Sequence, residues 1–178
     1  MSLLRAADSA GAGISLNSAS RVNHESSGFC CRIRARKVSD MTSITRVAEE
    51  FFEACETGKG WEACRAYCVP DATFSAQATP LNDVTTLAKY TDWMKGILTL
   101  FPDARYELKS FATDTARSNI AAYAVFHATH TGQGGPVPPT GRRMSTDYVY
   151  VMQFQGEKIS HMTKIWNSEL ALKEIGWV

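Results

Sequence analysis

The sequence predicts one small α+β domain, and three observations lead to that prediction. Apolar residues recur at helical spacing in the first half of the chain. From residue 104 onward, they alternate with polar residues at strand spacing. The composition supports a single core, since 44% of the 178 residues are apolar and 10% are aromatic. We therefore expect one folded domain over residues 41–178.

Residues 1–40 differ in composition from the rest of the chain. They are rich in Ser, Ala, Gly and Arg, carry a basic excess, and contain few large apolar side chains. Such a segment cannot bury enough apolar surface to fold, so we expect a disordered extension. Because an amphipathic helix begins just after Met41, this residue is a candidate true start. The upstream segment is then either a misassigned start or a targeting segment, such as an organellar transit peptide.

The first helix is expected to begin near residue 44 and to end at Gly58 and Gly60. Its apolar positions follow the i, i+3, i+4, i+7, i+8 and i+11 spacing of one helix face: Ile44, Val47, Ala48, Phe51, Phe52 and Cys55. Together they predict a helix that packs one face against the core.

A second, short helix is expected to carry Trp61, Cys64 and Cys68 on one face. Pro70 would end it, because proline lacks the backbone N–H that a helix interior needs. Residues 72–78 then alternate between small or aromatic and polar side chains, which predicts a strand.

A third helix is expected after Asn82 or Asp83, either of which can cap it. It would end at Pro102. Its apolar stripe is Leu87, Tyr90, Met94, Ile97, Leu98 and Phe101.

Four strands are expected near residues 104–112, 118–131, 143–154 and 158–167, separated by turn residues. Consecutive strands joined by short turns form an antiparallel sheet. This order excludes a doubly wound parallel fold and its nucleotide site at a strand-to-helix crossover.

Composition excludes several classes of function. The mildly acidic residues 41–178 offer no basic surface for nucleic acid, and no apolar run reaches the roughly 18 residues that cross a bilayer. Five cysteines without paired CxxC spacing favour a reducing, cytoplasmic location. His127 and His130 lie three apart on a predicted strand and so face opposite sides, which argues against a shared metal. Gly132, Gly134 and Gly135 precede no helix, so they do not form a phosphate cradle. We expect neither a metal nor a cofactor.

Residues 129–141 read Thr-His-Thr-Gly-Gln-Gly-Gly-Pro-Val-Pro-Pro-Thr-Gly and precede the basic pair Arg142 and Arg143. This hairpin resembles that of the SnoaL-like polyketide cyclases. The run Gly156-Glu157-Lys158-Ile159 and the ending Glu174-Ile175-Gly176 are similar to that family's last strand and tail. The resemblance covers about residues 41–178.

The resemblance implies a cone-shaped fold, shared with nuclear transport factor 2, ketosteroid isomerase and scytalone dehydratase. A curved, mostly antiparallel sheet would wrap around about three helices and enclose an apolar pocket. It also implies a homodimer formed through the outer face of the sheet. In the family's cyclases, a last-strand motif resembling Ile-x-Glu-His-Trp-Asp ends in the aspartate that serves as general acid/base. Aligned on Lys158-Ile159, this chain has Lys164 at that position.

The family register places Lys164 in the pocket together with Met162 and Trp166, because alternate residues of a strand share a face. A lysine in an apolar pocket could serve as a base, a Schiff-base amine or an oxyanion donor. The alternative is an ammonium that reaches solvent along an apolar stem.

The other candidate residues follow from the same register. Tyr148 and Tyr150 would face inward on the preceding strand, with His130 at the end of the strand before it, and any of the three could polarise a carbonyl. The expected apolar wall of the pocket consists of Phe74, Trp93, Met152, Met162 and Trp166.

These observations favour a cofactor-independent enzyme of the cyclase, isomerase or hydratase type that acts on a small apolar carbonyl compound resembling a polyketide. Replacement of the family's acid by Lys164 keeps a second hypothesis open. The chain could instead be a non-catalytic module of the same fold, which binds a small ligand or a protein.

Overall fold

The computed structural model describes residues 44–178. The predicted N-terminal extension, the candidate start at Met41, and the cysteines Cys30 and Cys31 lie outside this range. Within it, residues 44–56 form the first helix. Gly58 and Gly60 follow with φ angles of 68° and 72°, so the chain leaves the helix through left-handed positions that glycine adopts without strain. The predicted end of this helix is confirmed.

The second predicted helix is shorter than the sequence suggested. Helix α2 spans Gly60–Cys64 and continues as a 3-10 turn over Arg65–Tyr67. Strand β1, Cys68–Ala76, begins immediately afterwards. The prediction that Cys68 lies on the helix and that Pro70 ends it is therefore wrong.

Pro70 lies inside a strand because the ladder makes room for it. Cys68 pairs with Ile159 of the neighbouring strand, and the register shifts before pairing resumes at Thr73. Proline has no N–H to give to a ladder, so it is tolerated where the regular pairing is interrupted.

Helix α3 spans Leu87–Ile97, and its N-cap is Thr86 rather than Asn82 or Asp83. The hydroxyl of Thr86 accepts a hydrogen bond from the backbone N–H of Lys89 at 3.3 Å. The predicted cap is wrong because a 3-10 turn, Thr79–Leu81, precedes this segment. Asn82 is used to close that turn.

The remaining strands are β2 (Arg105–Asp114), β3 (Asn119–Thr129), β4 (Arg143–Gln155) and β5 (Lys158–Trp166), and the last helix is α4 (Ser168–Ile175). The sheet order is β1-β5-β4-β3-β2. Strands β2 to β5 pair antiparallel, as predicted, while β1 runs parallel to β5. The α+β class with a mostly antiparallel sheet is confirmed.

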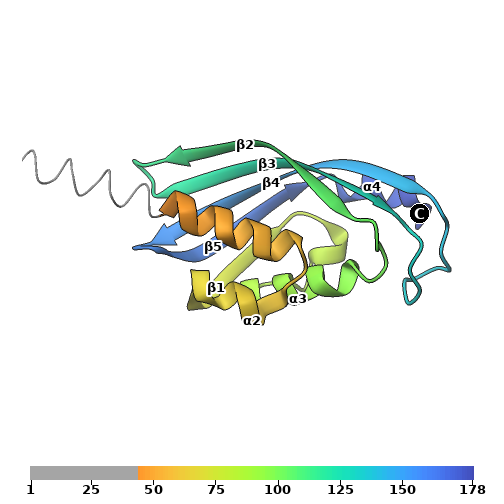
Figure 1. The fold of residues 1–178 in the computed structure, drawn as a ribbon, viewed down its shortest axis with the longest axis horizontal. Helices are drawn as coiled ribbons and strands as arrows, with labels where there is room; N and C mark the ends of the chain where they lie inside the picture. The colour runs from red at the N-terminus through yellow and green to blue at the C-terminus, as the bar shows by residue number, and fades with distance from the viewer. Residues whose placement is uncertain (1–43) are drawn as a thin grey trace, which may run out of the picture.

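The sheet is curved and does not close into a barrel, and the first helix, α2 and α3 lie along its concave face (Figure 1). Helix α4 follows β5 and lies at the end of the sheet where β5 terminates. Alternate residues of β3 and β4 are buried beneath these helices, which places the core between the helices and the sheet.

An irregularity in β5 sets which of its side chains face the core. Gln153 pairs with His161, but the next residue, Phe154, pairs with Ile159, so Ser160 has no partner of its own. This bulge lets both Ile159 and Met162 face inward. From Met162 onward the strand alternates regularly, so Lys164 is buried and Ile165 is exposed.

Three further observations concern residues 44–178. None of their helices is long and apolar enough to span a membrane. Cys55, Cys64 and Cys68 are buried free thiols. No cluster of metal-ligating side chains occurs in this range.

Candidate functional site

A small cavity of about 50 Å³ lies between the concave face of the sheet and helices α3 and α4. Most of its lining is apolar, and the polar or ionisable side chains that reach it are Glu56, Thr146, Tyr148 and Lys164. Partly exposed side chains separate the cavity from solvent: Pro80, Trp93, Ile97, Trp166, Leu172 and Trp177. A ligand larger than a few water molecules would therefore enter by displacing aromatic and aliphatic side chains at this rim.

Lys164 is buried in the cavity wall, with only 8% of its surface exposed. It lies on β5 opposite Tyr150 of β4. Lys164 and Trp166 also border an open hollow of about 440 Å³ between β1 and β5.

Aromatic rings surround the ammonium of Lys164. Their centroids lie 4.8–6.0 Å from Nζ, and the rings belong to Tyr90, Trp93, Tyr148, Tyr150 and Trp166. Ring faces attract cations at these distances, so the rings replace part of the hydration that burial removes.

Glu56 is the second buried ionisable group of the site and is not among the residues predicted from the sequence. It lies in the last turn of the first helix with 5% of its surface exposed. Tyr148 donates to its Oε2 at 2.7 Å, and Tyr150 donates to its Oε1. One signal could have identified it, because Glu56 follows Phe52 by four residues and so extends the apolar stripe of that helix. A carboxylate on a core-facing stripe is buried unless the helix ends before it.

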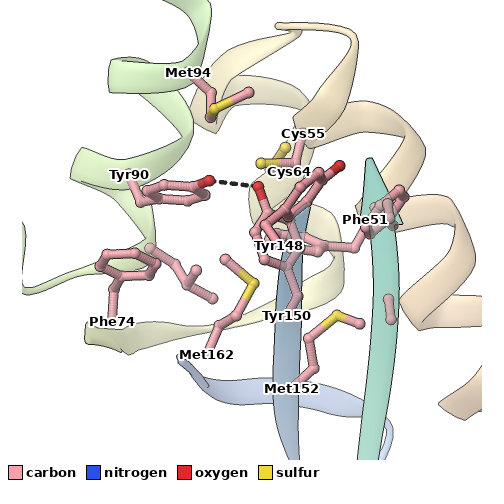
Figure 2. Packing of buried hydrophobic residues seen from close by; sticks show 14 of the residues in the cluster. Phe51, Cys55, Cys64, Phe74, Tyr90, Met94, Tyr148, Tyr150, Met152 and Met162 are labelled. Atoms are coloured by element: carbon pink, nitrogen blue, oxygen red, sulfur yellow. Dashed lines mark hydrogen bonds between the residues drawn. The ribbon is translucent and has the colours of Figure 1, made fainter. Parts of the chain in front are cut away.

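Tyr90 of α3 joins Lys164 to the carboxylate. Its phenol oxygen accepts a hydrogen bond from Lys164 Nζ at 3.1 Å and bonds to the hydroxyl of Tyr150. Figure 2 shows this Tyr90–Tyr150 bond, with Phe74 and Met162 packed beside it. The Tyr90 ring stacks on Phe74, with centroids 4.2 Å apart. Helix 44–56, α3, β4 and β5 each contribute one group to a continuous chain from Lys164 to Glu56.

Burial shifts the pKa values of the whole group. Desolvation lowers the pKa of Lys164 below its ordinary value, although the nearby Glu56 carboxylate opposes the shift. Desolvation raises the pKa of Glu56, opposed by Lys164 and the hydrogen bonds from the two phenols. The pKa values of Tyr90 and Tyr150 are also raised, chiefly by burial. Each shift favours the neutral form of its group.

The structure brings together some of the predicted site residues but not all of them. Lys164, Tyr148, Trp93 and Trp166 line the cavity. Tyr150 lies behind them and contributes through its hydrogen bonds. The three remaining predicted wall residues are buried in the hydrophobic core and do not line the cavity: Phe74, Met152 and Met162.

His130 lies apart from this group. It is fully buried next to Phe101 and Trp177, both of which line the cavity, but it does not reach the cavity itself. Its Nδ1 accepts hydrogen bonds from Trp177 Nε1 at 3.1 Å and from the backbone N–H of Thr140 at 3.3 Å. His130 therefore joins the β3–β4 loop to the C-terminal tail.

The arrangement can perform proton transfer in an apolar environment. The buried Lys164 amine and the buried Glu56 carboxyl group are connected by tyrosine hydroxyl groups, and both residues line the same cavity. General acid–base chemistry next to a carbonyl needs groups whose pKa values have been moved by their surroundings.

Comparisons with known proteins agree with this fold. The family model described as SnoaL-like polyketide cyclase matches residues 46–175. AclR from Streptomyces galilaeus, a proposed hydroxylase, is 23% identical over 78% of this chain and 83% of its own, with a TM-score of 0.63. IdmH from Streptomyces antibioticus, a proposed polyketide cyclase, is 19% identical over 75% of this chain and 98% of its own, with a TM-score of 0.61. No curated protein sequence matches the chain.

Proposed function

Because the chain belongs to the SnoaL-like polyketide cyclase family, we propose that it is a cofactor-independent enzyme of the cyclase, isomerase or hydratase type. Its substrate would be a small, largely apolar carbonyl compound resembling a polyketide. The observation that carries the proposal is the buried Lys164 amine, which faces an apolar cavity together with the Tyr148 phenol.

The proposed chemistry removes a hydrogen from the carbon next to the substrate carbonyl. Lys164, in its neutral form, accepts that proton. The hydroxyl of Tyr148 turns from Glu56 to the carbonyl oxygen and stabilises the negative charge that develops there. The enolate can then close a ring, shift a double bond or eliminate water, depending on the substrate.

The family's last-strand motif resembles Ile-x-Glu-His-Trp-Asp, and its final aspartate is the acid. The resemblance aligns Lys164 with that aspartate, so the proposed catalytic group of this chain differs from it in charge. An aspartate needs burial to become a good base near neutral pH through a raised pKa, whereas a lysine reaches the same range through a lowered one. Burial provides that direction of shift for Lys164, because it removes water from around the amine.

The first test is a thermal-shift screen of the full chain with polyketide esters, cyclic ketones, steroids and terpenoid epoxides. Lys164→Met and the exposed Lys89→Met are screened beside it. A ligand that binds the folded state raises the apparent melting temperature according to its occupancy. We expect stabilisation that is lost in Lys164→Met and kept in Lys89→Met.

Turnover is then measured with the ligands that bind. NMR in D₂O follows exchange of the hydrogens next to the carbonyl, which reports proton removal whatever the later steps are. Loss of a general base lowers such rates by about 10²–10⁴-fold. Full exchange by Lys164→Met would assign the chemistry to another group.

The small cavity volume favours a second candidate function, a non-catalytic binding module of the same fold. At about 50 Å³ the cavity holds little beyond a few water molecules until its rim opens. A stable complex with another protein, together with an ordinary Lys164 pKa by NMR titration, would support the module. A strongly lowered Lys164 pKa together with ligand-dependent exchange would support the enzyme.

We also propose a homodimer through the outer face of the sheet. Tyr123, Val149 and Ile165 form a row across β3, β4 and β5 on that face, and Ile165 is 59% exposed. A charge placed in a buried apolar contact is costly. We expect light scattering to give twice the monomer mass for the wild type and the monomer mass for Ile165→Asp.

A further inference from the structure

The hydrogen bonds between Lys164 and Glu56 have a fixed direction. A phenol has only one hydrogen, and Tyr150 gives its hydrogen to Glu56. Tyr150 must then accept from Tyr90, and Tyr90 must accept from Lys164, as the 3.1 Å bond from Nζ shows. Every hydrogen in the chain therefore points from the amine toward the carboxylate.

A hydrogen-bonded chain of this kind can transfer a proton from Lys164 to Glu56 without moving either side chain. If each hydrogen shifts to its acceptor, Lys164 loses one proton and Glu56 gains one, while both phenols stay neutral. The charged pair, an ammonium and a carboxylate, becomes an uncharged amine and a carboxylic acid. Among residues 44–178, no ion pair within 4.0 Å holds either group in its charged form. Burial favours the uncharged pair, because it avoids two desolvated charges.

An uncharged lysine that faces an apolar cavity is a nucleophile as well as a base. We propose that Lys164 forms an imine with the carbonyl carbon of an aldehyde or ketone substrate, and that Glu56 stores the proton this step requires. The inference rests on the proposed function, since it concerns the same cavity and the same carbonyl substrates. It adds a covalent intermediate and a catalytic role for Glu56, which lines that cavity.

The atoms of this reaction balance within the site. The nitrogen lone pair of Lys164 attacks the carbonyl carbon, and the oxygen takes up a proton as the nitrogen gives one up, which yields a neutral carbinolamine. The C–O bond then breaks, and the hydroxyl leaves as water with the proton stored on Glu56, passed on by Tyr148. The products are a protonated imine on Lys164, one water molecule and the Glu56 carboxylate.

The imine makes the next step easier than direct enolisation. Its positive nitrogen withdraws electrons from the neighbouring carbon, whose hydrogen can pass to the Glu56 carboxylate and leave an uncharged enamine. The enamine carbon can form a new bond to a second carbonyl carbon, whose oxygen takes up the proton from Glu56, which restores the carboxylate and leaves a protonated imine on Lys164. This step closes a ring when both carbonyls belong to one molecule. Hydrolysis of the resulting imine returns Lys164 and Glu56 to their starting forms.

The experiment uses the full chain and the small 1,3-diketone acetylacetone as the probe. An uncharged amine condenses with it to a conjugated enaminone, which is seen as a new near-ultraviolet absorbance and as a mass increase in the intact protein. A second probe, cyclohexanone with cyanoborohydride, reduces any imine to a stable secondary amine, and peptide mapping then locates it. We expect one adduct, on Lys164.

The control variants separate folding from chemistry. Lys164→Met removes the amine, while Lys164→Arg keeps a cation at the position but cannot form an imine. Both should lose the adduct, and Lys89→Met, which removes an exposed lysine of α3, should retain it. Melting curves establish that each variant is folded. An adduct that forms equally well in folded Lys164→Arg would overturn the proposal.

The outcomes also distinguish this proposal from the acid–base function. Hydrogen exchange that depends on Lys164, without enaminone or reduced adduct at that residue, overturns the imine and leaves the acid–base function standing. An absence of ligand stabilisation, exchange and adduct overturns both. The covalent step is supported if the wild type and Lys89→Met form an adduct at Lys164 and the two Lys164 variants form none.

Discussion

Lys164 and Glu56 lie at opposite ends of one hydrogen-bonded chain of side chains, in which Lys164 donates to Tyr90 and Glu56 accepts from Tyr150. The two groups come from the last strand and the first helix, which are far apart in the sequence. Both groups are buried, so each depends on neighbouring tyrosine hydroxyl groups for its hydrogen bonds.

A double-mutant cycle measures the energy that couples the two ends. Glu56→Gln removes the proton acceptor at one end of this hydrogen-bonded chain, and Lys164→Met removes the amine at the other, so each single variant leaves one ionisable group buried without its counterpart. The double variant leaves neither. We expect its loss of unfolding free energy in urea to be smaller than the sum of the single losses by about 0.5–3 kcal/mol. Additive losses would show that the chain does not couple the two groups.

The pH dependence of stability tests the state of Glu56. Burial raises its pKa above the ordinary value of 4.5. A raised pKa means that the folded state binds the proton more tightly than the unfolded state. The stabilisation is therefore complete below pH 4.5 and disappears as the pH rises through the folded-state pKa.

Two variants isolate this effect from the titration of Lys164. In Lys164→Met, Glu56 is the one member of this buried pair that can still titrate. The double variant Glu56→Gln/Lys164→Met removes both ionisable groups. We expect the unfolding free energy of Lys164→Met to rise relative to the double variant as the pH is lowered from neutrality to 4.5. Parallel curves over that range would indicate that the folded state does not raise the pKa of Glu56.

The sequence predicts the sheet well because its signal is local. Strands β2 to β5 begin and end within two residues of the predicted bounds, since their inward and outward side chains alternate regularly. The start of β1 was not predicted, because Pro70 is compatible with a strand only where the ladder shifts register. That shift is a property of the pairing with β5 and has no local signal.

The candidate site likewise contains residues that the sequence predicts and residues that it does not. The inward orientation of Lys164 and Tyr148 follows from alternation along their strands. Glu56 was missed because a glutamate near the end of a helix is usually exposed, and only its place on the apolar stripe indicates otherwise. The separation of His130 from the cavity depends on how Phe101 and Trp177 pack, which no spacing in the sequence describes.

Gly132 is predicted to be the least replaceable glycine of the β3–β4 loop. Its N–H donates to the backbone oxygen of Leu100 at 2.9 Å, and a Cβ atom there would lie 2.1 Å from the backbone oxygen of Thr99. Backbone atoms cannot move aside as a flexible side chain does. We expect Gly132→Ala to lower the unfolding free energy by about 1–3 kcal/mol or more.

Gly96 provides the matched control for this substitution. It lies in α3, and a Cβ atom there would meet nothing within 4 Å. Alanine is favoured over glycine in a helix by about 0.5–1 kcal/mol. Gly96→Ala should therefore raise the midpoint of urea unfolding. Equal effects of the two alanines would contradict the close approach at Gly132.

Asp103 fastens the end of β3 to the turn that follows α3. Its two carboxylate oxygens accept from the backbone N–H and the hydroxyl of Thr129, at 2.7 and 2.6 Å. Asp103→Asn replaces one acceptor by an NH₂ group, so at most one of these bonds survives in its present form. We expect a loss of about 1 kcal/mol in unfolding free energy at neutral pH, the usual net value of one hydrogen bond.

The same bonds predict how this difference changes with pH. They lower the pKa of Asp103 below its ordinary value of 3.8. A lowered pKa in the folded state stabilises the protein above pH 3.8, and the stabilisation is lost as the pH falls through the folded-state pKa. The unfolding curves of the wild type and Asp103→Asn should therefore converge in acid. Asp71→Asn, at an exposed position of β1, is the control and should not change the neutral-pH stability. A gap between wild type and Asp103→Asn that persists unchanged below the folded-state pKa would mean that the carboxylate charge contributes nothing to this contact.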